Sequence, residues 1–311
     1  MAATCPWCNA PRVDEPSCPR CGANYAKAEQ IKAQGKVAAE VRAQAVLETV
    51  TSENSLDGVG EDLELEWKLR AVAIPAALLC GILFHLALPG MQRIFLGMPV
   101  HELGHATTAW FHGYWSIPTL WKAITAESRG MVMPLLLLAG LGYLVWRAQR
   151  AGLFLLAALG AALIVVQGFC TLAVKAKTAE SLIVWGGDGT GMILATALMA
   201  SFFFGRDTQL YRGSLRWGFL VIGAGAFSDM FGTWWKARGD YGAIPFGEME
   251  GVGLSDPTRL VDDFNWTTDA VVHRYVATGI ACLVVLALVY AWGVRRALLA
   301  ARKRQRARAL Q

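Results

Sequence analysis

Residues 94–112 read IFLGMPVHELGHATTAWFH, an apolar stretch that is interrupted by His101, Glu102 and His105. The stretch is close to the length of about 20 residues that a helix needs to cross the hydrocarbon core of a bilayer. Ionisable side chains in such a segment are costly unless they are paired or functional. We therefore expect a membrane helix built around a polar site, with a simple polar contact between helices as the alternative.

The spacing of the two histidines predicts a metal site. His101 and His105 are four residues apart, so on a helix they face the same side, one turn apart. Both imidazoles can then bind one zinc ion at about 2.0–2.1 Å. Glu102 follows the first ligand and is expected to act as general base on zinc-bound water. His112 lies about 10.5 Å beyond His105 along a straight helix, so the third ligand must come from elsewhere.

The composition around this stretch is that of a membrane protein with a polar head. Of the 311 residues, 55% are hydrophobic and only 17% are charged, whereas soluble domains carry about 25% charged residues. Residues 1–70 are polar, and residues 71–295 are predicted to form an all-α polytopic membrane domain of about 6–8 transmembrane helices. Apolar segments are expected near 71–89, 94–112, 131–147, 152–174, 181–204, 215–235 and 270–294. Tryptophans at many segment ends, Trp234 among them, fit an interfacial belt.

The distribution of charge predicts orientation in a multi-pass cell-membrane protein. The basic tail 296–311 and the loop 147–150 should be cytoplasmic, and the acidic loop 236–269 should face the other side. With a cytoplasmic N-terminus, one segment before Arg147 must re-enter or cross once more, and residues 114–118 are a plausible re-entrant piece. The first 30 residues contain no apolar core of a secretory signal peptide. The short tail has no aromatic residues, so we expect no nucleic-acid partner.

The N-terminal region contains two C-x-x-C pairs, Cys5 with Cys8 and Cys18 with Cys21. Four thiolates at this spacing predict one structural zinc ion in a ribbon over residues 1–24. Disulfides are the alternative. They are disfavoured in the reducing cytosol, where a segment without a signal peptide is expected to lie. Residues 25–70 are expected to form a helical and flexible linker. The ribbon is expected to bind a protein partner or to position substrate.

The motif has a resemblance to a known family. His101-Glu102-Leu103-Gly104-His105, preceded by Gly97-Met98-Pro99-Val100 and followed by His112-Gly113, resembles the site-2-protease family of intramembrane zinc metallopeptidases. The close resemblance covers about residues 94–115. It implies cleavage of membrane-embedded protein substrates within the lipid bilayer, with His101 and His105 as zinc ligands and Glu102 as the catalytic residue. It also implies a third ligand, usually Asp, from a later membrane helix.

Asp188 is the preferred candidate for this third ligand. It precedes Gly189 at the start of an apolar run, as in the family pattern, although no Asn-Pro comes before it. The neighbouring glycines, Gly186 to Gly191, permit either close backbone approach or local unwinding. A turn residue at the interface is the alternative for Asp188, and its rivals as ligand are Asp229, His273 and Glu180.

Three classes of function follow from these features. The leading expectation is an intramembrane zinc metallopeptidase with one catalytic and one structural zinc ion. The second is a non-catalytic membrane scaffold or regulator that keeps the zinc site. A transporter that uses intramembrane acids and histidines is the third, but it leaves the order His-Glu-x-x-His unexplained.

Overall fold

The chain is described by a computed structural model for residues 4–31, 63–205, 208, 214–249 and 253–308. It divides into two compact units, Met1–Asp62 and Leu63–Gln311. The helical unit therefore begins at Leu63, ahead of the predicted boundary at residue 71.

The small N-terminal unit is built around its cysteines. Two isolated β-bridges, Thr4 with Pro11 and Ser17 with Asn24, close one loop around each pair. Cys5, Cys18 and Tyr25 are buried in its small core. Residues 25–31 are helical, as predicted for the start of the linker, and the rest of the predicted linker up to residue 62 lies outside the described residues.

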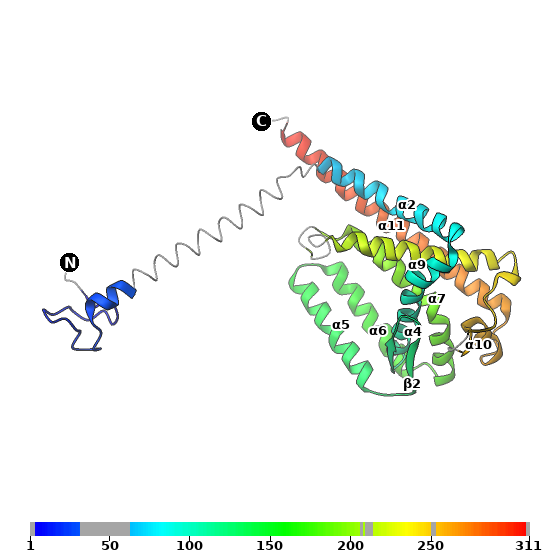
Figure 1. Ribbon diagram of the computed structural model, residues 1–311, viewed down its shortest axis with the longest axis horizontal. Helices are drawn as coiled ribbons and strands as arrows, with labels where there is room; N and C mark the ends of the chain where they lie inside the picture. Colours follow the sequence, from blue (N-terminus) through cyan, green and yellow to red (C-terminus); the bar gives the residue numbers. More distant parts are fainter. Residues whose placement is uncertain (1–3, 32–62, 206–207, 209–213, 250–252, 309–311) are drawn as a thin grey trace. The chain divides into compact units, whose positions relative to one another are not determined.

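The larger unit consists mainly of helices. In chain order the longer ones are α2 (Leu63–Ala87), α4 (Met98–Phe111), α5 (Val132–Arg150), α6 (Phe154–Leu172), α7 (Ala176–Ala200), α9 (Leu215–Ala237), α10 (Asp256–Asp262) and α11 (Thr268–Arg308). Short helix α3 (Pro89–Gln92) and a π-helical turn η1 (Arg93–Gly97) lead into α4, and 3₁₀ turns η2 (Ser201–Phe203) and η3 (Tyr241–Ala243) follow α7 and α9. Helices α5 and α6 form a hairpin, and α2 lies beside α11 (Figure 1).

Five of these helices are long and apolar enough to cross a membrane, which suggests a membrane protein. The spans are Leu65–Ala87, Val132–Arg150, Phe154–Leu172, Ala176–Phe203 and Thr268–Arg302. Large apolar side chains on them remain exposed to the surroundings, among them Leu155, Val165 and Leu172. Such exposure is costly in water and expected in lipid. The predicted basic tail is a continuation of α11, which is helical as far as Arg308.

Within the described residues, the number of spans is lower than the 6–8 predicted. The segment 94–112 is divided between η1 and α4, and α4 has only 14 residues. Helix α4 follows α3 and η1 without a break, so residues 89–111 form one helical stretch with a π-helical turn inside it, and this stretch is not among the five candidate spans. The segment 215–235 is helix α9, but it carries Arg216, Asp229 and Lys236 and is not apolar enough to count as a span.

The prediction of an all-α fold is wrong between α4 and α5. The predicted re-entrant piece is strand β1 (Tyr114–Pro118), which pairs in antiparallel fashion with β2 (Ala123–Arg129). A second small pair, β3 (Glu248–Met249) with β4 (Gly253–Leu254), precedes α10. Pairing satisfies backbone groups that a lone extended segment would leave without partners.

Glycines allow α4 and α7 to cross closely. A Cβ atom at Gly104 would lie 2.5 Å from the carbonyl oxygen of Gly187 and 2.8 Å from the amide nitrogen of Gly191. These are backbone atoms, which cannot rotate away. Of the two sequence-based alternatives for Gly186–Gly191, close backbone approach is therefore confirmed, and α7 continues through these residues without unwinding.

We expect Gly104→Ala to destabilise the helical unit by about 1–3 kcal/mol, because the added methyl group must push α4 and α7 apart. The measurement is the midpoint of thermal unfolding in detergent micelles. Gly140→Ala in α5 is the matched control, since a Cβ there meets no atom within 4 Å. It should leave stability unchanged or raise it by up to about 1 kcal/mol. Equal midpoints for the two variants would contradict the close crossing.

Candidate metal sites

The two histidines of α4 form the centre of the larger site. One helical turn separates them, so both rings project from the same face, and their Nε2 atoms lie 3.1 Å apart. The ring planes are nearly perpendicular, at 89°. His101 is buried and His105 is mostly so. The predicted arrangement of the pair is therefore present.

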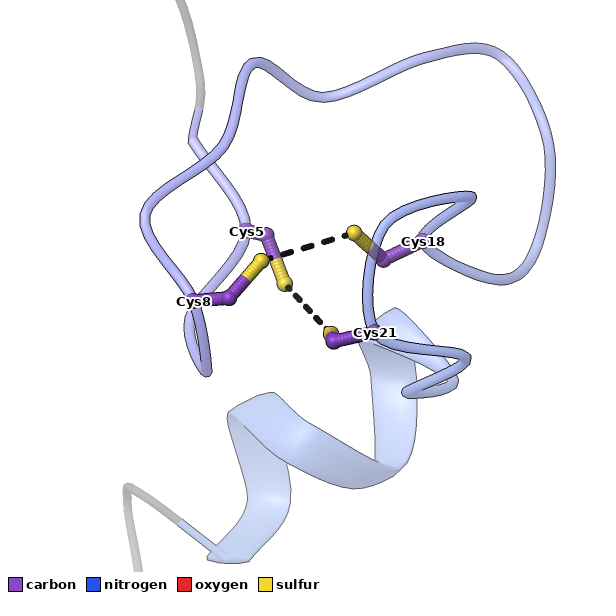
Figure 2. A group of neighbouring side chains, drawn as sticks. All are labelled: Cys5, Cys8, Cys18 and Cys21. Atoms are coloured by element: carbon purple, nitrogen blue, oxygen red, sulfur yellow. Dashed lines mark hydrogen bonds between the residues drawn. The ribbon is translucent and has the colours of Figure 1, made fainter.

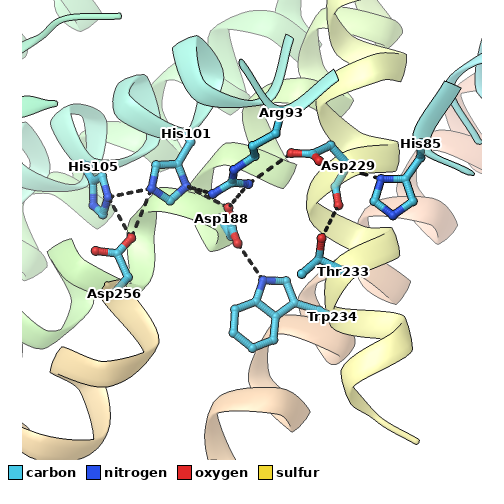
Figure 3. Close-up of polar contacts among 9 residues, drawn as sticks. All are labelled: His85, Arg93, His101, His105, Asp188, Asp229, Thr233, Trp234 and Asp256. Carbon is cyan, nitrogen blue, oxygen red and sulfur yellow. Dashed lines mark hydrogen bonds and ion pairs between the residues drawn. The ribbon is translucent and has the colours of Figure 1, made fainter. Parts of the chain in front are cut away.

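Asp256 completes a three-residue group. It is the first residue of α10, and its Oδ2 lies 3.1 Å from Nε2 of His101 and 3.0 Å from Nε2 of His105 (Figure 3). The ligand atoms of these residues all lie within 4.8 Å of one another, close enough to hold one metal ion. The third member of the group thus comes from a short helix between two candidate spans, and not from a membrane helix.

The opposite nitrogen of each ring is bound to a neighbouring group on α7. Nδ1 of His101 lies 2.7 Å from Oδ1 of Asp188, and Nδ1 of His105 lies 2.7 Å from the carbonyl oxygen of Ile183. In both contacts Nδ1–H is the donor, because a carboxylate or carbonyl oxygen accepts. Nε2 is therefore the nitrogen that each ring directs toward Asp256, as an N–H donor when the ring is protonated and as a lone pair when the ring is neutral. Carboxylate and carbonyl partners of this kind orient histidine ligands in metal sites.

The structure corrects the choice of Asp188 as third ligand. Its carboxylate lies on the Nδ1 side of His101, whereas the candidate ion site lies on the Nε2 side. The rivals do not join the group either. Asp229 pairs with Arg93, His273 is exposed beside Asp269, and Glu180 lines the nearby cavity outside the group.

A network of charged and polar groups holds Asp188 in place. Arg93 of η1 donates from one nitrogen to Asp188 at 3.0 Å and to Asp229 at 3.1 Å. The indole Nε1 of Trp234 donates to the other oxygen of Asp188 at 2.7 Å. Figure 3 shows the continuous series of contacts from Asp256 to His85. Trp234 is 1% exposed and belongs to the core, not to the predicted interfacial belt.

Gly187 has no side chain, and its absence makes room for the two histidine rings. A Cβ at this position would lie 2.6 Å from Nε2 of His105 and 2.8 Å from Nε2 of His101. The residue before Asp188 must therefore lack a side chain if α7 is to place both Asp188 and the backbone of Ile183 against the rings. The glycines of Trp185-Gly186-Gly187-Asp188-Gly189 form part of the site's geometry.

The electrostatics of Asp256 suit a metal ligand. Burial raises the pKa of its carboxyl group, but the charge of His105 and hydrogen bonds from both rings outweigh burial and hold the pKa below its usual range. Asp256 is therefore ionised at neutral pH, which is the state that binds a cation.

A cavity of about 1340 Å³ opens beside this group. Its wall includes His101, Glu102, His105 and Asp256, together with strand β2. Glu102 is buried, and its carboxylate has no hydrogen-bond or ion-pair partner among the described residues. A buried carboxylate without a protein partner, next to a candidate metal group, is available to a water molecule or a substrate.

The four N-terminal cysteines form a second candidate site. The Sγ atoms of Cys5 and Cys21 lie 3.9 Å apart and those of Cys8 and Cys18 lie 3.6 Å apart (Figure 2). None of the four is in a disulfide. Burial raises the pKa of the Cys18 thiol, but hydrogen bonds from the backbone of Arg20 and Cys21 lower it to about 6. A thiolate is the form that binds metal.

In the sequence, Asp256 is one of several acidic residues of the loop 236–269 and carries no sign of its role in the group. One local signal was present, because Ser255-Asp256-Pro257 is typical of a helix start. That signal predicts α10 but not its position. No local pattern places the start of α10 against histidines that lie about 150 residues earlier in the chain.

Comparison with known proteins gives no match to this chain, whether to protein-family models, to curated proteins or to solved structures.

We expect Asp256→Ala to remove the metal ion from the histidine group, because two imidazoles alone hold an ion far less tightly than three ligands. Metal content by mass spectrometry of the purified protein should fall from about two ions per chain toward one. Asp262→Ala, on the same helix but exposed, is the control and should keep both ions. Full metal content in Asp256→Ala would exclude Asp256 from the group.

For Asp188→Asn we expect a smaller effect, namely a metal affinity lowered by about 10–100-fold, because this residue orients a ligand and does not bind the ion. Competition with a chelator of known affinity measures the change. A loss of metal as complete as in Asp256→Ala would instead support Asp188 as a ligand.

Proposed function

We propose that the chain is an intramembrane zinc metallopeptidase that hydrolyses peptide bonds of membrane-embedded protein substrates. The observation that carries this proposal is the convergence of His101, His105 and Asp256 on one point, in the wall of a cavity that also contains Glu102. The resemblance of residues 94–115 to the site-2-protease family supports it.

The donor set fits zinc. Two imidazoles and one carboxylate, with a fourth position left open, are the ligands of catalytic zinc in several soluble peptidases. Ligands at about 2.0–2.1 Å in tetrahedral directions lie about 3.3–3.4 Å from one another. The three separations in this group are 3.0, 3.1 and 3.1 Å. Small movements of the three side chains are enough to place the ion.

Bound zinc supplies a Lewis acid that polarises the substrate carbonyl and lowers the pKa of water toward about 7. Glu102 accepts the proton of the attacking water while the water oxygen forms a bond to the carbonyl carbon. The C=O electron pair moves onto oxygen. When it returns, the C–N bond breaks, and Glu102 delivers its proton to the departing amine.

The cavity suits an extended peptide. Carbonyl groups of an intact helix are already hydrogen-bonded, so a membrane-spanning substrate must unwind locally before water can attack. The cavity wall contains both apolar side chains, such as Ile124 and Ile183, and polar ones, such as Thr125. Such a wall can accept an unwound segment with its backbone groups and its apolar side chains.

We also propose that the four cysteines hold a structural zinc ion in a ribbon, as the sequence predicts. Zinc–sulfur bonds of about 2.3 Å in a tetrahedron separate sulfur atoms by about 3.8 Å. The separations of 3.6 and 3.9 Å bracket this value. An N-terminal module of this size needs a metal ion to fold.

We expect Glu102→Gln to lower the rate of substrate cleavage by at least about 10²–10⁴-fold, because the amide cannot accept a proton. Zinc content should stay at the wild-type level, since Glu102 is not a ligand. The measurement is cleavage of a single-span model substrate by protein reconstituted in liposomes.

Glu248→Gln is the matched control, because Glu248 is exposed in β3 and does not line the cavity. It should cleave at the wild-type rate. Normal cleavage by Glu102→Gln would exclude this mechanism. A wild-type protein that binds zinc but cleaves no substrate would favour the non-catalytic scaffold instead.

A further inference from the structure

Tyr275 places a buried phenol in the wall of the cavity. It lies near the start of α11, is 1% exposed, and lines the same cavity as His101, Glu102 and Asp256. Its hydroxyl group has no hydrogen bond to any other described residue. A hydroxyl group at the wall of a cavity, without a partner among the described residues, is available as a donor to a water molecule or a ligand in the cavity.

Two tryptophans hold the ring of Tyr275. Its centroid lies 4.0 Å from that of Trp234 and 5.9 Å from that of Trp185, and both pairs are nearly parallel, at 19° and 18°. Stacking against two indoles fixes the plane of the ring. Trp234 also donates to Asp188, the partner of His101. The orientation of Tyr275 is therefore linked to the same network that orients the metal group.

A packing role does not need the hydroxyl group. Tyr290, on the same helix, uses its hydroxyl to donate to the carbonyl oxygen of Ala71 at 2.8 Å. Tyr275 has no such contact with the described residues, and a phenylalanine would stack equally well on the tryptophans. The neighbouring donors of the network are already in use, because Arg93 donates to two carboxylates and Trp234 to one.

Peptide hydrolysis is accelerated by a hydrogen-bond donor that supplements the metal ion at the substrate carbonyl. Negative charge builds up on the substrate carbonyl oxygen as the tetrahedral intermediate forms, and a preorganised donor in a water-poor site lowers that barrier. Resting on the function proposed above, we propose that Tyr275 is a catalytic residue whose hydroxyl donates a hydrogen bond to this oxygen. The proton remains on the phenol, and Glu102 alone carries the proton to the amine.

The test is Tyr275→Phe, which removes the hydroxyl and keeps the stacked ring. We expect kcat to fall by about 10²–10³-fold, as for loss of one oxyanion donor, with KM changed less than about twofold. Binding of a phosphinic peptide, whose tetrahedral P–O group imitates the intermediate, is measured by calorimetry and should weaken by a similar factor. Zinc content and melting temperature should match the wild type.

Tyr290→Phe is the matched control and should leave kcat and phosphinic-peptide affinity unchanged. A Tyr275→Phe protein that contains full zinc and keeps kcat and phosphinic-peptide affinity within about twofold of wild type overturns the role of Tyr275 while the proposed function stands. A wild-type protein that neither cleaves substrate nor binds the phosphinic peptide overturns both. A Tyr275→Phe protein with a raised KM but the wild-type kcat also excludes the proposed role.

Discussion

The hydrogen bond between His101 and Asp188, 2.7 Å long, is the interaction on which the helical unit's site depends. It joins α4 to α7, sets which ring nitrogen faces the candidate metal position, and brings a carboxylate into an apolar bundle. That carboxylate is tolerable only because Arg93 and Trp234 also bind it. The close packing of α4 on α7 at glycine positions makes the bond geometrically accessible.

From this interaction the other features of the site follow. With Nδ1 of both rings bound to groups of α7, the Nε2 atoms are left for the candidate metal group, and α10 places Asp256 beside them. This group borders the cavity that Glu102 and Tyr275 also line. Arg93, Asp188 and Trp234 line the same cavity, so the groups that hold His101 in place also border the space in which the proposed substrate would lie.

Much of the site was accessible from local patterns. His101 and His105 share a helical face because of their spacing, and Glu102 is adjacent. The cysteine pairs likewise come together as predicted. Asp188 was predicted as the third ligand, and in the structure its carboxylate contacts Nδ1 of His101, since a sequence cannot show which nitrogen of a ring a carboxylate meets. The hairpin of β1 and β2 was missed because its strands are short and lie between strong apolar segments.

The sequence alone determined the apolar helices, the face that His101 and His105 share, and the clustering of four cysteines, because periodicity and short spacing act within a few turns of chain. Only the tertiary structure decided that Asp256 joins the histidines, that Asp188 supports His101, and that Trp234 and Tyr275 stack beside them. These contacts link residues about 40–155 positions apart in the chain. Their existence depends on how helices pack in three dimensions, and no local pattern encodes that packing.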